Sequence, residues 1–166
     1  MQVPTIITAR RQSPSLNRIL SLSQKRDHSL SENINKGTYT RCQDKRCLTC
    51  PSVITSKTYT TKNGTKLFRN ANMTCKTRVL LYLLICKKCR DEYTGETGDL
   101  IHRRNNLHRN QITNDDYRKL KVSHHIHECG NDEYELFPFF KCYKDCHIFR
   151  EEMELHFRAK INPALH

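Results

Sequence analysis

The sequence contains no run of 18 apolar residues, so no membrane-spanning helix is expected. The N-terminal residues also lack the continuous apolar segment of a secretory signal peptide, which disfavours secretion. Internal repeats and polymerase motifs are absent as well. These absences predict an intracellular protein with no membrane partner.

Acidic residues are few: 17 Asp and Glu stand against 29 Lys and Arg, and the formal net charge is +12. The excess is concentrated, because residues 41–110 hold fifteen Lys or Arg and only five Asp or Glu. A basic block of this kind is typical of a protein that binds a polyanion, and nucleic acid is the favoured partner. A solvated basic surface is the alternative. We therefore expect a nuclear protein.

The chain length of 166 residues suits one main domain, and 36% hydrophobic with 28% charged residues indicates a folded module. Its pattern predicts an α/β (α+β) domain with a small, mostly antiparallel, three-stranded sheet flanked by helices. Three segments are expected: a polar N-terminal arm over residues 1–40, a Cys-rich module over residues 41–77, and the main domain over residues 78–166.

Three segments have strand length, and the first of them is an apolar run. Residues 79–86 and 91–95 are separated by a short basic turn and predict a hairpin that carries Tyr82 on one strand and Tyr93 on the other. Residues 134–141 predict a third strand, and Pro138 within it favours the edge of the sheet. Asn63 and Gly64 predict a tight turn between two further extended segments.

Two helices follow from apolar periodicity. Asp99 is expected to cap a helix over residues 100–112, whose apolar face would comprise Leu100, Ile101, Leu107 and Ile112. Arg104 and His108 fall on the same face. An arginine within a packing stripe is costly to desolvate unless it meets an anion at an opening, and phosphate is the obvious anion.

The second helix is predicted over residues 145–161. Its apolar face would comprise Cys146, Phe149, Met153, Phe157 and Ile161. Glu154 lies beside this stripe, whereas Glu151 and Glu152 point further away. The pattern therefore selects Glu154 as the acid nearest a buried cleft, although a simple ion pair with Arg150 is the alternative.

Nine cysteines in an intracellular protein favour metal binding over disulfides. Two Cys-x2-Cys turns supply pairs of thiolates, and we expect two structural zinc ions. The first set would be Cys42, Cys47, Cys50 and Cys75, and the second Cys86, Cys89, His125 and Cys129. A single ribbon that joins both turns is the main alternative. Cys142 and Cys146 are expected to be buried thiols rather than ligands.

Residues 80–97 resemble the core of the GIY-YIG nucleases, and more narrowly the version at the C-terminal end of Penelope-like retroelements. That version places Cys-x2-Cys between the two tyrosine motifs, here Cys86 and Cys89, followed by a Gly-Glu-Thr-Gly turn at residues 95–98. The likeness extends over residues 42–166, and less securely to residues 10–20. It includes Arg104, Asn106, His108, Glu154-x-x-Phe157 and the Pro-Ala-Leu of residues 163–165. The second metal set also resembles the family's two-cysteine, two-histidine site, with one histidine replaced by cysteine.

This resemblance implies a Mg²⁺-dependent (or Mn²⁺-dependent) DNA endonuclease that nicks target DNA, with RNA of the parent element as a further partner. Glu154 would hold the Mg²⁺ ion and Arg104 would clamp the scissile phosphate. Tyr82 would orient or deprotonate the attacking water, with Tyr93 in support and His108 assisting proton transfer or phosphate contact. As alternatives, both tyrosines fit the core of a sheet, and Arg104 fits a surface ion pair.

Two residues depart from the family pattern. Leu80 stands where the first motif opens with glycine, and His166 stands where the family ends in asparagine beside the active site. The second change favours the rival hypothesis of a zinc-stabilised DNA- or RNA-binding protein that has lost catalysis. A zinc-bearing protein-interaction module is a third possibility.

Overall fold

The computed structural model describes residues 37–117, 119–129 and 131–165. Most of the expected N-terminal arm, and His166, therefore lie outside the described residues. In chain order the elements are η1 (Cys50–Ser52), β1 (Thr58–Thr60), β2 (Lys66–Phe68), β3 (Leu80–Cys86), β4 (Glu92–Thr97), α2 (Ile101–Thr113), η2 (Asp115–Tyr117), α3 (Lys121–Glu128), β5 (Tyr134–Lys141) and α4 (His147–Ile161).

The main sheet has three antiparallel strands in the order β4-β3-β5, and β1 and β2 form a separate two-stranded hairpin. Three α-helices flank the main sheet in the described part of the chain. The predicted α/β class, with a small antiparallel sheet flanked by helices, is confirmed. No helix among the described residues is long and apolar enough to cross a membrane.

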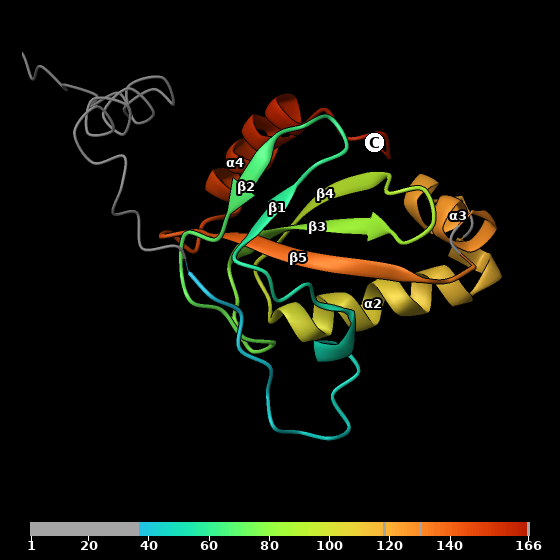
Figure 1. Ribbon diagram of the computed structural model, residues 1–166, viewed down its shortest axis with the longest axis horizontal. Helices are drawn as coiled ribbons and strands as arrows, with labels where there is room; N and C mark the ends of the chain where they lie inside the picture. The colour runs from blue at the N-terminus through green and yellow to red at the C-terminus, as the bar shows by residue number, and fades with distance from the viewer. Residues whose placement is uncertain (1–36, 118, 130, 166) are drawn as a thin grey trace, which may run out of the picture. The chain divides into compact units, whose positions relative to one another are not determined.

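Strand β3 is the centre of the fold, and all seven of its residues are buried. It is apolar throughout because it is covered on both faces: α2 and α3 lie on one, and α4 with the β1–β2 hairpin on the other (Figure 1). Leu84 and Cys86 pack with Ile112 and Ile126 on the first face. Across the sheet, α4 contributes Phe157, whose ring lies 5.0 Å from that of Phe139.

Strand β5 is an edge strand, as Pro138 predicts, because proline lacks the N–H that a second ladder would need. Part of its outer edge is nevertheless covered. Val53 bridges to Leu136, and the Ile54 N–H donates to the Leu136 carbonyl at 3.0 Å. The Cys-rich segment therefore packs on the same sheet as the elements that follow it.

Helix α2 begins one residue later than expected, with Leu100 at the N-cap and Asp99 accepting a hydrogen bond from the Leu100 N–H. Its buried residues are Ile101, Asn105, His108 and Ile112. The prediction for Leu107 is wrong, since its side chain is 41% exposed. Leu107 lies about 100° around the helix axis from the buried His108 and therefore points away from the sheet. Asn105 lies on the same side of the helix as His108 and is buried in its place.

Helix α4 starts at His147 rather than Asp145, with the exposed Cys146 at its N-cap. The burial expected for Cys146 is therefore wrong, because this residue precedes the helix and has no packing face. Phe149, Met153 and Ile161 are buried as expected. The sequence pattern does not predict helix α3, because residues 114–123, which include its first turn, have a polar, loop-like sequence.

Candidate metal centres and candidate active site

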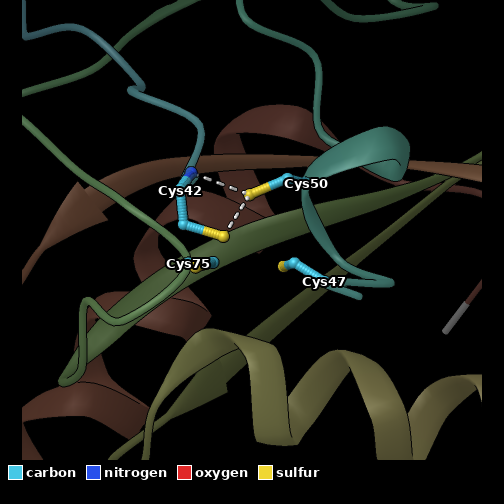
Figure 2. A group of neighbouring side chains, drawn as sticks. All are labelled: Cys42, Cys47, Cys50 and Cys75. Atoms are coloured by element: carbon cyan, nitrogen blue, oxygen red, sulfur yellow. Dashed lines mark hydrogen bonds between the residues drawn. The ribbon is translucent and has the colours of Figure 1, made fainter. Parts of the chain in front are cut away.

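The first cysteine cluster lies between two loops and the start of η1. Its four members have sulfur atoms that all lie within 4.8 Å of one another: Cys42, Cys47, Cys50 and Cys75. Figure 2 shows the side chains converging, with the Cys50 Sγ 3.6 Å from the Cys42 Sγ and 3.3 Å from the Cys42 backbone nitrogen. Four sulfur donors around one point match a tetrahedral structural metal site.

Backbone amides of the Cys-x2-Cys turn favour the ionised form of one of these thiols. Burial would raise the pKa of Cys47, but hydrogen bonds from the backbone N–H groups of Cys50 and Thr49 bring it to about 7. Burial and the neighbouring sulfur atoms instead raise the pKa of Cys75. Four thiols at these separations repel one another when ionised, and a bound divalent cation offsets that repulsion.

The first cluster is tied directly to helix α2. The Ile101 N–H donates to the Thr77 carbonyl at 2.9 Å, and the His102 N–H donates to the Cys75 carbonyl at 3.1 Å. The opening amides of a helix have no partners within the helix, so these carbonyls satisfy them. A shift of the Cys75 turn would therefore move the two carbonyl groups that accept hydrogen bonds from the start of α2.

The second cluster joins the tip of the β3–β4 hairpin to α3. Its donor atoms also lie within 4.8 Å of one another, and they belong to Cys86, Cys89, His125 and Cys129. The Cys89 Sγ lies 3.1 Å from the His125 Nε2. His125 and Cys129 are four residues apart at the end of α3, which places both on one side of the helix.

The part of the chain that the structure describes therefore has two Cys/His clusters that can bind metal ions. They contain the two sets of four residues that the spacings predict. The alternative of one ribbon is not what the structure shows, because Cys47 and Cys50 lie in one cluster while Cys86 and Cys89 lie in the other.

A buried hydrogen-bond chain links β3 to α2. The Arg104 Nε–H donates to the Tyr82 phenolic oxygen at 2.8 Å, and that oxygen lies 2.6 Å from the His108 Nε2. Tyr82 is 0% exposed and His108 2%. Arginine only donates, so the Tyr82 oxygen accepts from Arg104, and the tautomer of His108 decides which of the two atoms donates in the second bond.

The ring of His108 is neutral near neutral pH. Its burial and then the positive charge of Arg104 lower the pKa of His108 to about 3. The His108 Nδ1 is buried and has no hydrogen-bond partner among the described residues. Burial also raises the pKa of Tyr82, so the phenol stays protonated until another group removes its proton.

Tyr93 of β4 and Glu154 of α4 lie beside the hydrogen-bond chain formed by Arg104, Tyr82 and His108. The Tyr93 ring lies 6.2 Å from the His108 ring. Burial and the charge of Glu154 raise the pKa of Tyr93, while Arg104 opposes them. Burial and then Glu96 raise the pKa of Glu154. Unlike Tyr82, the side chains of Tyr93, Arg104 and Glu154 are only partly buried.

The alternative pairing of Glu154 with Arg150 does not occur. Arg150 is buried, and its Nε–H donates to the Glu96 carboxylate at 2.6 Å while its Nη1 donates to Asp145 at 3.1 Å. Glu154 thus keeps its carboxylate available beside Tyr93. Sequence patterns gave no signal for the pair of Glu96 and Arg150, because the two residues lie on different elements 54 positions apart.

Asn105 is a second residue that sequence reasoning missed. Its Nδ2–H donates to the Thr49 hydroxyl at 3.2 Å, and its Oδ1 accepts from the Tyr134 hydroxyl at 2.9 Å. The fully buried amide therefore connects the first cysteine loop, α2 and β5. Its neighbour Asn106, which matches the family pattern, is exposed.

Comparison with known proteins gave no further guide to this site. The chain matches no protein-family model, no curated protein and no solved structure. The likeness to GIY-YIG nucleases therefore rests only on the sequence motifs named above.

Proposed function

We propose that this chain is a Mg²⁺-dependent DNA endonuclease of the GIY-YIG type, similar to the C-terminal endonuclease of Penelope-like retroelements. It would act in the nucleus and hydrolyse a phosphodiester bond of target DNA, with RNA of the parent element as a further partner. The observation that carries the proposal is the chain from Arg104 through Tyr82 to His108, with Glu154 beside it.

Arg104 is suited to hold the scissile phosphate. Its Nε–H is held by Tyr82, which orients the planar guanidinium fork, and the other N–H groups of the fork suit two phosphate oxygens. Charge on these oxygens grows as the phosphodiester bond is cleaved, so an oriented guanidinium stabilises the transition state more than the bound substrate.

Tyr82, His108 and Tyr93 would manage the proton of the attacking water. His108, whose Nε2 lies 2.6 Å from the Tyr82 oxygen, would orient the phenol toward the attacking water, and its pKa of about 3 makes it too weak a base to keep the proton itself. Tyr93, which is nearer the surface, would position the water or the substrate.

Glu154 is the residue that would hold Mg²⁺. A carboxylate oxygen suits this hard cation, and the nearby charge of Glu96, which raises the pKa of Glu154, favours a cation at this place. When bound, the ion supplies neutralisation of phosphate charge and a water of lowered pKa. We assign zinc to the two Cys/His clusters, where it would stabilise the fold without taking part in the reaction.

One observation favours a second candidate, a zinc-stabilised nucleic-acid-binding protein without catalysis. Tyr82 is fully buried, so water does not reach its hydroxyl unless the site opens. In that case the bonds among Tyr82, Arg104 and His108 would serve packing alone, with the buried polar groups satisfying one another.

The test is cleavage of supercoiled plasmid DNA by purified protein with Mg²⁺ or Mn²⁺. Arg103→Ala is the matched control for Arg104→Ala, because Arg103 is the neighbouring arginine of α2 and only forms an exposed ion pair with Asp99. We expect wild type and Arg103→Ala to nick DNA and Arg104→Ala to be inactive. An inactive wild type that still binds DNA would support the second candidate, and equal cleavage by all three would remove Arg104 from the site.

A further inference from the structure

A basic cavity lies against the first cysteine cluster, on the outward side of α2. Its volume is about 440 Å³, and it lies between the loop that carries Cys42 and Cys47, the Cys75 turn and the first turns of α2. Arg46, Lys76 and His102 line it, together with Asn106 and Leu48. The role proposed above for Arg104 uses none of these residues.

The cations at this cavity are available for an external anion. Lys45, Arg46 and Lys76 form no ion pair with an acid within the described residues, whereas Lys62, Arg78, Lys87 and Arg90 all do. The one acid of the cavity, Asp44, accepts a hydrogen bond from the backbone N–H of Arg46. Four thiolates with one zinc ion would carry a net charge of about −2, and Asp44 adds −1. Arg46 and Lys76 of the lining, together with Lys45 and Arg109 beside it, carry four positive charges and exceed this sum.

Leu48 is an apolar residue of the same cavity lining and lies near the basic residues Arg46 and Lys76. It is 63% exposed, although the next residue, Thr49, is 1% exposed and hydrogen-bonded to Asn105. Arg109 fixes the loop tip by donating from Nη2 to the Leu48 carbonyl at 2.6 Å. A leucine held rigidly between basic residues fits an apolar contact with a nucleic acid, whose sugars and base edges lie between its phosphates.

Helix α2 connects this cavity with the candidate active site. His102, Asn106 and Arg109 follow its outward side, while Arg104 turns toward Tyr82. Arg104 is two positions from both His102 and Asn106, so it lies about 200° around the helix axis from them. A helix with its side chains is about 10–12 Å across, close to the roughly 12 Å width of the DNA major groove, so one duplex lying over α2 can touch the cavity on one side and Arg104 on the other.

We propose that the cavity and Leu48 form a second DNA-binding surface that holds duplex DNA beside the cleavage position. Arg46 and Lys76 bind phosphates, and Leu48 contacts sugars and base edges. This inference rests on the proposed function, because it supplies the substrate contacts of the same enzyme. It also assigns the first cysteine cluster a purpose beyond stability, since the metal-binding loop is the element that presents Arg46 and Leu48.

The test measures binding of the full chain to a short labelled duplex at several salt concentrations. Arg46→Ala/Lys76→Ala is compared with Lys57→Ala/Lys119→Ala, a control that removes two exposed lysines from other parts of the surface. Losing two phosphate contacts should reduce the slope of log K against log salt by about 1.8, and the control should keep the wild-type slope. Leu48→Ala should weaken binding about 10-fold with an unchanged slope, because the lost contact is apolar.

Cleavage distinguishes failure of this inference from failure of the proposed function. The Arg46→Ala/Lys76→Ala variant should need more DNA to reach half of its maximal cleavage rate, whereas the Lys57→Ala/Lys119→Ala control should cut as the wild type does. Equal slopes and affinities for all variants, with cleavage intact, would overturn the second surface alone. No binding of DNA by the wild type would overturn both proposals, and tighter, Arg46-dependent binding of single-stranded RNA would replace duplex DNA as the ligand.

Discussion

The hydroxyl of Tyr82 lies directly over Gly95, its partner in the register of β3 and β4. A Cβ atom added at Gly95 would stand 2.7 Å from the Tyr82 oxygen and 2.9 Å from the Tyr93 ring. Only glycine leaves room for both tyrosines at this point of the sheet. The close approach explains why this strand carries a glycine at a position where β-branched residues are otherwise favoured.

Gly95→Ala should lower the free energy of unfolding by about 1–3 kcal/mol, because neither the strand backbone nor the packed rings can move away freely. It should also remove DNA cleavage by displacing the Tyr82 hydroxyl from Arg104. Chemical denaturation and plasmid nicking measure the two effects. Gly64→Ala is the contrast: its added methyl group meets nothing within 4 Å, and only the φ of +83° opposes it. That variant should lose stability but keep its activity per folded molecule.

His108→Gln should change how stability depends on pH. The pKa of His108 is about 3 in the folded state and near 6.5 in the unfolded chain, so the unfolded state takes up a proton first as pH falls. The stability contributed by the neutral ring is complete above about pH 6.5 and is lost progressively below it. Between pH 7.5 and 5.5 the wild type should lose about 1.4 kcal/mol more than His108→Gln.

Urea unfolding of both proteins at the two pH values provides this comparison. Taking the difference between variants cancels the effect of protonating the metal ligands, which both share. A constant difference across the pH range would mean that His108 is not held neutral by burial.

Metal content should follow the two clusters independently. Cys75→Ser and Cys89→Ser should each retain one zinc ion of two and lose several kcal/mol of stability, because a structural metal binds only the folded chain. Cys146→Ser, which alters an exposed thiol outside both clusters, should retain two ions. Elemental analysis and thermal unfolding measure these outcomes. One ion in the wild type would point to a single site, and none would refute the assignment of metal.

Many local features of the fold and of the metal clusters could be predicted, because the spacing of residues along the sequence indicates them. Cys-x2-Cys turns bring two sulfur atoms together in any fold, and the x3 spacing of His125 and Cys129 indicates a pair of ligands, although the helix that carries them is not predicted. The strands around Tyr82 and the turn at Gly64 were equally accessible. Each of these pairs, strands and turns depends on residues that are close in sequence, whereas the joining of Cys89 to His125 spans 36 positions.

The contacts that escaped prediction depend on residues far apart in sequence. Hydrophobic periodicity selected Leu107 and passed over Asn105, because an amide looks like a surface residue until Thr49 and Tyr134 satisfy its hydrogen bonds. Arg69 is likewise fully buried, with its guanidinium bound to the Ile54 and Ser56 carbonyls. No local pattern reveals that such a charge will be enclosed.

Glu154→Gln separates a metal-binding carboxylate from a structural one. Glutamine keeps the size of the side chain but loses the charge that holds a divalent cation, so cleavage should fall by about 10²-fold or more. Glu152→Gln is the matched control, because Glu152 is an exposed glutamate two residues earlier on α4. Both variants remove one negative charge from the same helix, so affinity for DNA without Mg²⁺ should rise slightly and equally. Single-turnover cleavage across a range of Mg²⁺ concentrations measures the difference. If Glu154→Gln cuts as fast as Glu152→Gln at every concentration, the cation is held elsewhere and Glu154 has no part in the reaction.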